Sequence, residues 1–259
     1  MRVLRVLSTI VVVGASVAAC DTDSAGPPHL RVEIVDTRPH DVTAFTEGFE
    51  VAGDRLLEGT GMSGASQLRA SDLATGTELT RVDLPIPLFG EGITDTGSRI
   101  WQLTWRDGIA IERDTVTLVE RRRVPYQGEG WGLCAQTDRL VMSNGTATLT
   151  FRDPTTFAKT GSIDVTGFPG AQLNELDCAD DGTVYANAWP TDTILRIDPR
   201  SGRVTGQIDA SGLLDRPDVS QTQRDRADVE NGIAHLPGTD RFLITGKYWP
   251  LTFDVRFVE

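Results

Sequence analysis

The chain has 259 residues and a formal net charge of −12 at pH 7. So acidic a chain lacks the basic face that supplies most of the affinity for nucleic acid, which excludes nucleic acid as a partner. Its length accommodates one domain with a sizeable core.

Residues 1–19 have the features of an export signal. Arg2 and Arg5 precede an uncharged stretch too short to span a membrane, and small residues end it before Cys20. The ending Val-Ala-Ala-Cys resembles a bacterial lipobox, which predicts cleavage before Cys20 and lipidation of its sulfur. An ordinary secretory signal is the alternative. We therefore expect residues 20–29 to form a lipidated tether and residues 30–259 to form an exported domain on the extracytoplasmic side.

Two segments at opposite ends of this domain alternate between apolar and polar residues, as half-buried strands do. They are residues 30–36 and residues 251–258. The first precedes all internal repeats and needs a partner. Pairing it with the C-terminal segment would remove open sheet edges, so we expect the two ends of the chain to close the fold together.

A carboxylate or amide beside a glycine or another carboxylate recurs along the chain, each time followed by an apolar strand, a turn and another strand. The interval is roughly 40 to 60 residues, which is typical of propeller blades. The sequence therefore predicts an all-β fold, a five-bladed β-propeller closed by the N-terminal strand and the last blade. The five anchors are Glu47-Gly48, Gly90-Glu91-Gly92, Glu129-Gly130-Trp131-Gly132, Asn174-Glu175 and Asn231-Gly232.

Residues 211–230 lengthen the interval between the last two repeats. They are polar, with little apolar periodicity, and indicate a surface loop with a short helix. A loop of this length either forms a rim or lid over a site or is a solvated insertion.

Cys134 and Cys178 are about one repeat apart, so they occupy equivalent positions on neighbouring blades. The exported compartment permits a disulfide between them, and two small buried thiols are the alternative.

The anchors are expected to converge at one end of the central channel. A second recurring position, on the following strand, adds two tryptophans and a lysine. A single tryptophan could equally be core packing and a lone lysine a solvated surface residue, but their shared register favours a polar site with aromatic walls. The set comprises Glu47, Glu91, Trp131, Asn174 and Asn231, with Trp105, Trp189 and Lys247 at the second position.

The sequence lacks the motifs of several other classes of enzyme. The three histidines do not have metal-ligand spacing, and there is no serine-hydrolase, zincin or phosphate-cradling motif. His40, between Pro39 and Asp41, is interpreted as a turn residue rather than a base.

From His40 to Val258 the chain resembles the glutaminyl cyclases of plant and bacterial type, also called glutamine cyclotransferases, which are five-bladed propellers. Each motif alone is weak, and the resemblance rests on all of them in order. They are His40-Asp41 with Ala44–Gly48, Phe89–Ile93, Gln102–Trp105, Gly128–Leu133, Leu173–Leu176, Ala186–Trp189, Asp228–Ala234 and Thr245–Pro250.

The resemblance implies conversion of a peptide's N-terminal glutamine to pyroglutamate with release of ammonia. It assigns Glu91 as the proton shuttle and implies that Asn174 and Lys247 contact the scissile amide oxygen or the peptide carbonyl. Position 47 departs from the plant pattern, which has glutamine there. Glu47 could anchor the α-amine or share the shuttle with Glu91. The resemblance places the substrate glutamine among Phe45, Phe89, Trp105, Trp131, Trp189 and Asn231.

The resemblance also implies that no cofactor or catalytic metal is required, and it leaves open a structural calcium ion. We expect a monomer that acts on peptides or proteins with N-terminal glutamine and meets the membrane only through its lipid. Two other classes fit the same anchors: a calcium-dependent, lactonase-like propeller hydrolase, whose metal would take oxygen ligands from several blades, and a non-catalytic peptide-binding lipoprotein.

Overall fold

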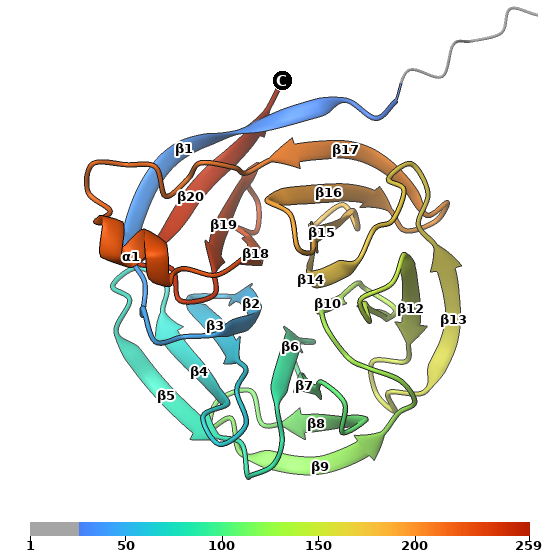
Figure 1. Ribbon diagram of the computed structural model, residues 1–259. Coiled ribbons are helices and arrows are strands. Elements are labelled where there is room, and N and C mark those ends of the chain that lie inside the picture. The colour runs from blue at the N-terminus through green and yellow to red at the C-terminus, as the bar shows by residue number, and fades with distance from the viewer. Residues whose placement is uncertain (1–25) are drawn as a thin grey trace, which may run out of the picture.

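The computed structural model describes residues 26–259, so the predicted export signal and lipidated Cys20 lie outside the described residues. The regular secondary structure of the described chain is almost entirely β-strand, in sheets that lie around a common centre (Figure 1). No helix in this part of the chain is long and apolar enough to cross a membrane.

Three sheets have four antiparallel strands each, and every strand pairs with the next one along the chain. The first comprises β2 (Thr46–Ala52), β3 (Arg55–Thr60), β4 (Gln67–Asp72) and β5 (Glu78–Asp83). The second comprises β6 (Gly90–Asp95), β7 (Ile100–Thr104), β8 (Ile109–Arg113) and β9 (Glu120–Pro125). The third comprises β10 (Leu133–Ala135), β11 (Leu140–Met142), β12 (Thr148–Arg152) and β13 (Lys159–Asp164).

The fourth sheet has eight strands in the order β14-β15-β16-β17-β1-β20-β19-β18. One half comprises β14 (Leu173–Cys178), β15 (Val184–Ala188), β16 (Thr193–Asp198) and β17 (Arg203–Asp209). The other half comprises β1 (His29–Pro39), β20 (Leu251–Val258), β19 (Arg241–Gly246) and β18 (Glu230–His235).

Strand β1 joins the two halves. It runs antiparallel to β20, with Arg31 opposite Val258 and Pro39 opposite Leu251. The predicted pairing of the chain ends is confirmed. The sequence did not predict that β1 also pairs parallel to β17, through residues 29–31. At eleven residues β1 is longer than β20, so its first residues extend far enough to meet β17.

The innermost strands of the sheets touch at the anchor glycines. A Cβ on Gly48 would lie 2.8 Å from the backbone nitrogen of Ile93, and one on Gly92 would lie 2.5 Å from the carbonyl oxygen of Trp131. Glycine is needed at both positions because the neighbouring backbone occupies the space of a side chain. These glycines therefore let the innermost strands approach closely, so that the side chains of neighbouring residues on these strands meet at one centre.

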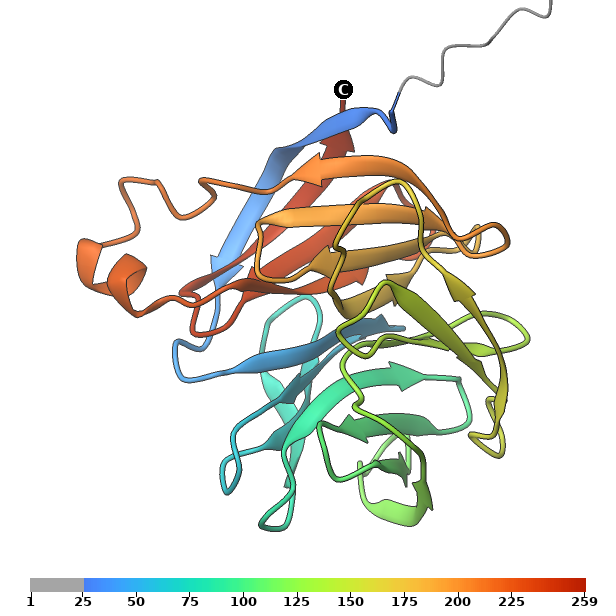
Figure 2. The ribbon, with the colours of Figure 1, turned by 45° about the vertical axis from the view of Figure 1, so that its right-hand side comes forward.

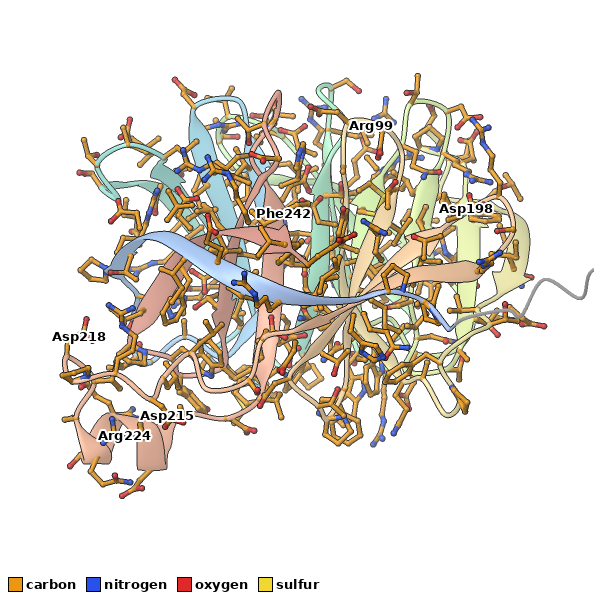
Figure 3. All side chains as sticks on the ribbon, turned by 90° about the horizontal axis from the view of Figure 1, so that it is seen from above. Arg99, Asp198, Asp215, Asp218, Arg224 and Phe242 are labelled. Carbon is orange, nitrogen blue, oxygen red and sulfur yellow. A yellow bond between two sulfur atoms is a disulfide. The ribbon has the colours of Figure 1, made fainter. Side chains whose placement is uncertain are left out.

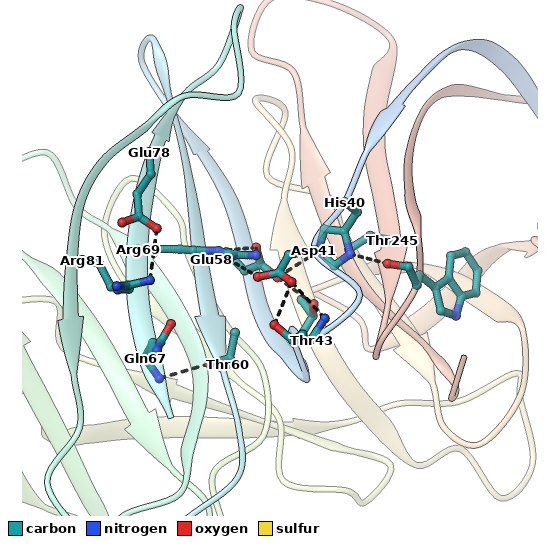
Figure 4. Close-up of polar contacts among 12 residues, drawn as sticks. His40, Asp41, Thr43, Glu58, Thr60, Gln67, Arg69, Glu78, Arg81 and Thr245 are labelled. Carbon is teal, nitrogen blue, oxygen red and sulfur yellow. Dashed lines mark hydrogen bonds and ion pairs between the residues drawn. The ribbon is translucent and has the colours of Figure 1, made fainter. Parts of the chain in front are cut away.

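Two further links tie neighbouring sheets. A disulfide joins Cys134 of β10 to Cys178 of β14, with Cα atoms 5.4 Å apart. A buried polar cluster lies where β1 ends against the first sheet (Figure 4). In it His40 Nε2 is 3.0 Å from Glu58, and Arg69 Nη2 donates to the same carboxylate at 2.6 Å.

The segment before β18 contains the predicted short helix, α1 (Gln221–Arg226). Ser220 starts it with a capping box, because its hydroxyl accepts from the Gln223 backbone while the Gln223 side chain accepts from the Ser220 backbone. The segment projects from the body of the molecule (Figure 2). Figure 3 shows Asp215, Asp218 and Arg224 on it, at the end of the molecule opposite Arg99.

Candidate active site

The anchor side chains gather at one end of the centre because of where they stand on their strands. Glu47, Glu91 and Asn174 lie at or near the first residue of the innermost strands β2, β6 and β14. Trp105 and Lys247 directly follow the next strands, β7 and β19. In an antiparallel pair the start of one strand lies beside the end of its neighbour, so both groups reach the same end of the molecule.

These residues line a cavity of about 390 Å³. Its walls combine aromatic rings, two carboxylates, an amide and an ammonium group. The lining residues are Phe45, Glu47, Phe89, Glu91, Trp105, Trp131, Asn174, Trp189, Asp228, Val229 and Lys247. A cleft of about 1000 Å³ elsewhere is lined by turn residues such as Gln136, Asp181 and Arg200 and has no aromatic lining, so the smaller cavity is the better candidate for an active site.

The aromatic walls form two contacting groups. Phe89 lies 5.5 Å from Trp105 and 6.2 Å from Phe45, measured between ring centroids. Trp131 and Trp189 pack edge to face at 5.9 Å. Such rings give a small apolar chain a defined volume, which suits a substrate whose conformation has to be fixed.

Glu47 is held by two protein donors. Lys247 Nζ donates to its Oε1 at 2.7 Å, and Asn231 Nδ2 donates to its Oε2 at 3.2 Å. The ammonium also lies 4.3 Å from the centre of the Phe45 ring, at a distance typical of a cation–π contact. Burial raises the pKa of Glu47 above its ordinary value, although Lys247 opposes the shift.

Glu91 is buried and differs from Glu47 in its partners. Its Oε2 is shielded from solvent and has no hydrogen-bond partner among the described residues. Burial, and then the charge of Glu47, raise the pKa of Glu91 well above its ordinary value, against the opposing effect of Lys247. A carboxylate with a raised pKa and an unpartnered oxygen can accept and return a proton.

The two predicted asparagines have different positions. Asn174 lines the cavity, and its side-chain amide makes no hydrogen bond to another described residue. Asn231 was predicted to bind substrate but does not line the cavity. It is fully buried, and its side-chain amide nitrogen donates to the Thr46 carbonyl and to Glu47. Its side chain therefore holds Glu47 in place.

His40 is not the turn residue that the sequence suggested. It is largely buried, and Nδ1 lies 2.8 Å from the Trp249 carbonyl oxygen. Burial alone would lower the pKa of His40, but the charge and hydrogen bond of Glu58 outweigh burial and raise it. The neighbouring Pro39 and Asp41 indicated a turn. The environment of His40 is instead decided by the carboxylate of Glu58, which is 18 residues away in the sequence but in direct contact with the ring.

Sequence reasoning missed three residues at the site. Asp228 and Val229 line the cavity because the loop before β18 forms part of its rim. Glu129 Oε2 accepts the indole N–H groups of both Trp105 and Trp131. The Gly-Glu-Gly pattern at residues 128–130 indicated that Glu129 could belong to the site. Only the contacts in the structure show which groups donate hydrogen bonds to it.

Among residues 26–259, no group of three or more histidine, cysteine, aspartate or glutamate side chains is arranged to hold a metal ion.

A family model described as glutamine cyclotransferase matches residues 6–257 of the chain. The chain belongs to the glutamine cyclotransferase family. The glutaminyl-peptide cyclotransferase of Arabidopsis thaliana is 35% identical over 233 residues, which are 88% of this chain and 72% of the relative. The crystal structure of Myxococcus xanthus glutaminyl cyclase matches with a TM-score of 0.79 and 37% identity, over 90% of this chain and 98% of that one. The resemblance that the motifs indicated is confirmed.

Each of the family motifs named above contributes at least one residue to the lining of this cavity. Glu91 of the Phe89–Ile93 motif, Asn174 of the Leu173–Leu176 motif and Lys247 of the last motif meet there. Residues more than 150 positions apart in the sequence thus form one site.

Proposed function

We propose that this chain is a glutaminyl-peptide cyclotransferase, which converts the N-terminal glutamine of peptides or proteins to pyroglutamate and releases ammonia. One observation carries the proposal: Glu91, buried in an aromatic-walled cavity, has a carboxylate oxygen without a partner. Membership of the family and the activity named for the plant and Myxococcus relatives support it.

The reaction forms a bond between the α-amine nitrogen and the side-chain amide carbon, and then breaks the bond from that carbon to the amide nitrogen. Ionised Glu91 takes the proton that the attacking amine loses and gives it to the departing nitrogen, which leaves as ammonia. Because the substrate contains both nucleophile and electrophile, the protein has to hold a folded side chain, move one proton and stabilise an oxyanion.

The contacts suggest a division of roles between the two glutamates. Both oxygens of Glu47 already accept hydrogen bonds, from Lys247 and Asn231, so we assign the shuttle to Glu91 alone. Glu47 holds the Lys247 ammonium at the cavity. The Asn174 amide and the remaining Lys247 protons would bind the amide oxygen on which negative charge develops, between the rings of Trp105, Trp131 and Trp189.

We further propose that turnover needs no cofactor. The chemistry of the donor set supports this, because Lys247 supplies a fixed positive charge where carboxylates would otherwise attract a cation. A structural calcium ion in the channel is compatible with the same mechanism.

The fold supports a five-bladed propeller. The eight-stranded sheet divides at the short parallel pairing of β1 with β17 into two four-stranded units, and the other three sheets are single units of the same kind. In this interpretation β1 is the outermost strand of the last blade.

We propose that the protein is a monomeric lipoprotein, exported by residues 1–19, lipidated at Cys20 and anchored on the extracytoplasmic side of the membrane. The lipobox-like sequence before Cys20 supports the anchor. Labelling with a radioactive fatty acid, compared between the wild type and Cys20→Ala, tests the anchor. Label in the wild type alone is expected; no label in the wild type would exclude the anchor, and label in both would exclude Cys20 as its site.

Ammonia release from Gln-Ala and from glutaminyl-β-naphthylamide by the full-length chain, purified in mild detergent, tests the activity. We expect ammonia release from both compounds and none from Asn-Ala. If the folded protein releases no ammonia, a calcium-dependent lactone assay and a peptide-binding assay distinguish the two alternative classes.

A further inference from the structure

Glu129 lies in the segment between β9 and β10, and its carboxylate is shared by two walls of the cavity. Its Oε2 accepts the indole N–H of Trp105 at 2.9 Å and that of Trp131 at 3.0 Å. Its Oε1 accepts from Arg106 Nε at 3.0 Å. Because one oxygen receives both indole donors, a single carboxylate fixes the orientation of the two rings relative to each other.

The backbone around Glu129 supports this arrangement. The Gly130 nitrogen donates to the Trp105 carbonyl at 3.0 Å, and the Trp131 nitrogen donates to the Ser143 carbonyl at 3.2 Å. The Arg106 guanidinium lies 3.8 Å from the centre of the Trp105 ring. The carboxylate therefore has a defined position between both tryptophans and is not a freely moving surface group.

We infer that Glu129 is a positioning residue, which orients the indole rings of Trp105 and Trp131 so that they hold the substrate glutamine side chain in its reactive conformation. This inference rests on the proposed cyclotransferase activity. In an intramolecular reaction the rate depends on how often the chain adopts the reactive rotamer, and rings free to rotate would restrict it less. No bond to the reacting atoms is required of Glu129 itself.

Glu129 has a second effect on the same cavity. Burial and Glu47 raise the pKa of Glu91 most, and the charge of Glu129 raises it further. The largest effects of charge on Glu91 come from Glu47 on β2, Lys247 after β19 and Glu129 before β10. Burial, and then the charge of Glu91, raise the pKa of Tyr126, and the acid Asp228 lines the same cavity. Removing the charge of Glu129 should therefore lower the pKa of Glu91, an effect that a merely structural role would not produce.

The test compares Glu129→Gln, which keeps an acceptor oxygen, with Glu129→Leu, which has none. Ammonia release by the full-length protein is measured across pH. We expect Glu129→Leu to lower kcat/KM by about 10- to 100-fold and Glu129→Gln by less than about 3-fold at optimal pH. In both variants the acidic limb of the pH profile should move to lower pH. Glu120→Gln, which removes an exposed acid at the start of the preceding strand β9, is the matched control and should change neither property.

A second background isolates the hydrogen bonds. The double variant Trp105→Phe/Trp131→Phe keeps aromatic rings and removes the indole donors, so adding Glu129→Leu to it should lower kcat/KM little further at optimal pH. If Glu129→Leu fails to fold, this double variant alone should show the same 10- to 100-fold loss. An equal loss from Glu129→Leu in both backgrounds, or wild-type kcat/KM in Glu129→Leu, would overturn the inference.

A readout that needs no turnover separates this inference from the proposed function. Glu129→Leu should change the near-ultraviolet circular dichroism of the tryptophans, while Glu120→Gln leaves it unchanged. If the wild type releases no ammonia, the proposed function fails whatever the spectra show. If the wild type turns over and the spectrum of Glu129→Leu equals that of the wild type, the positioning role fails and the function stands.

Discussion

Lys247 Nζ donates to the carboxylate of Glu47 at 2.7 Å inside the cavity. This pair leaves the neighbouring Glu91 as the carboxylate with a free, buried oxygen. Two glutamates that are close in space are therefore distinguished by their partners: Glu47 is held by a fixed positive charge and an amide, whereas Glu91 has an oxygen without a partner among the described residues.

The first prediction concerns Glu91. The change Glu91→Gln preserves shape and removes proton exchange, so kcat should fall by about 10²- to 10⁴-fold, the contribution typical of a general acid–base group. Steady-state ammonia release measures the fall, and a urea unfolding curve provides the control for folding. Turnover within a few-fold of the wild type would assign the shuttle to another group.

The second prediction concerns the charges beside Glu91. The negative charge of Glu47 raises the pKa of Glu91 and the positive charge of Lys247 lowers it. Because ionised Glu91 accepts the proton, Glu47→Gln should move the acidic limb of the kcat/KM profile to lower pH. Lys247→Met should move it to higher pH. The pH profiles of both variants check these directions, and shifts of the same sign in both would contradict the assignment.

The third prediction concerns metal removal. Lys247 already provides positive charge at the carboxylates, so treatment with EDTA should leave kcat unchanged within experimental error. A sample dialysed against buffer without chelator is the control. A loss of ammonia release that calcium restores would contradict this prediction, because it would show that the activity depends on a bound calcium ion.

The sequence was sufficient to predict the strand repeats, the pairing of the chain ends and most of the cavity lining. These follow from local signals, because strand periodicity and the position of an anchor on its strand decide which end of the molecule a side chain reaches. Glu91 and Lys247 were found in this way although they stand on different sheets.

The roles of Asn231, His40 and Glu129 could not be predicted from the sequence alone. Each depends on a partner whose relative position only the packed sheets define: Glu47 for Asn231, Glu58 for His40 and two tryptophans for Glu129. Repeat position and the family resemblance suggested that Asn231 faces substrate, whereas its side-chain amide is bonded within the protein.

The fourth prediction concerns the pH dependence of stability. The pKa of His40 is raised above its ordinary 6.5, so its contribution is complete below that pH and is lost as pH rises through the raised value. His40 and Arg69 lower the pKa of Glu58 from 4.5 to about 2 although burial opposes the shift, so its contribution is lost as pH falls toward that value. The stabilisation from this cluster should therefore be greatest between these limits.

The comparison of the wild type with His40→Gln tests this directly. The free energy of unfolding in urea should differ by about 2 kcal/mol near pH 5.5, the size expected for a hydrogen bond to a charged group, and by less at alkaline pH. A difference that does not vary with pH would show that the protonation of His40 plays no part.

The fifth prediction concerns the disulfide, which closes a separation of 44 residues. Replacing both cysteines by serine should lower the free energy of unfolding by about 2–4 kcal/mol, because the unfolded chain gains freedom. Turnover should persist, since Asn174 lies at the opposite end of β14 from Cys178. Loss of activity in a folded double variant would mean that the bond also shapes the cavity.

The position of β1 has a consequence for how the chain acquires its fold. Residues 29–39 leave the ribosome early, yet their main partner is β20, at residues 251–258. The sheet that contains both strands therefore cannot form until residues 251–258 have been synthesised, and contacts of such high sequence separation are slow to form. Late closure is compatible with the proposed export, because a chain whose β1 is still unpaired is not yet fully folded.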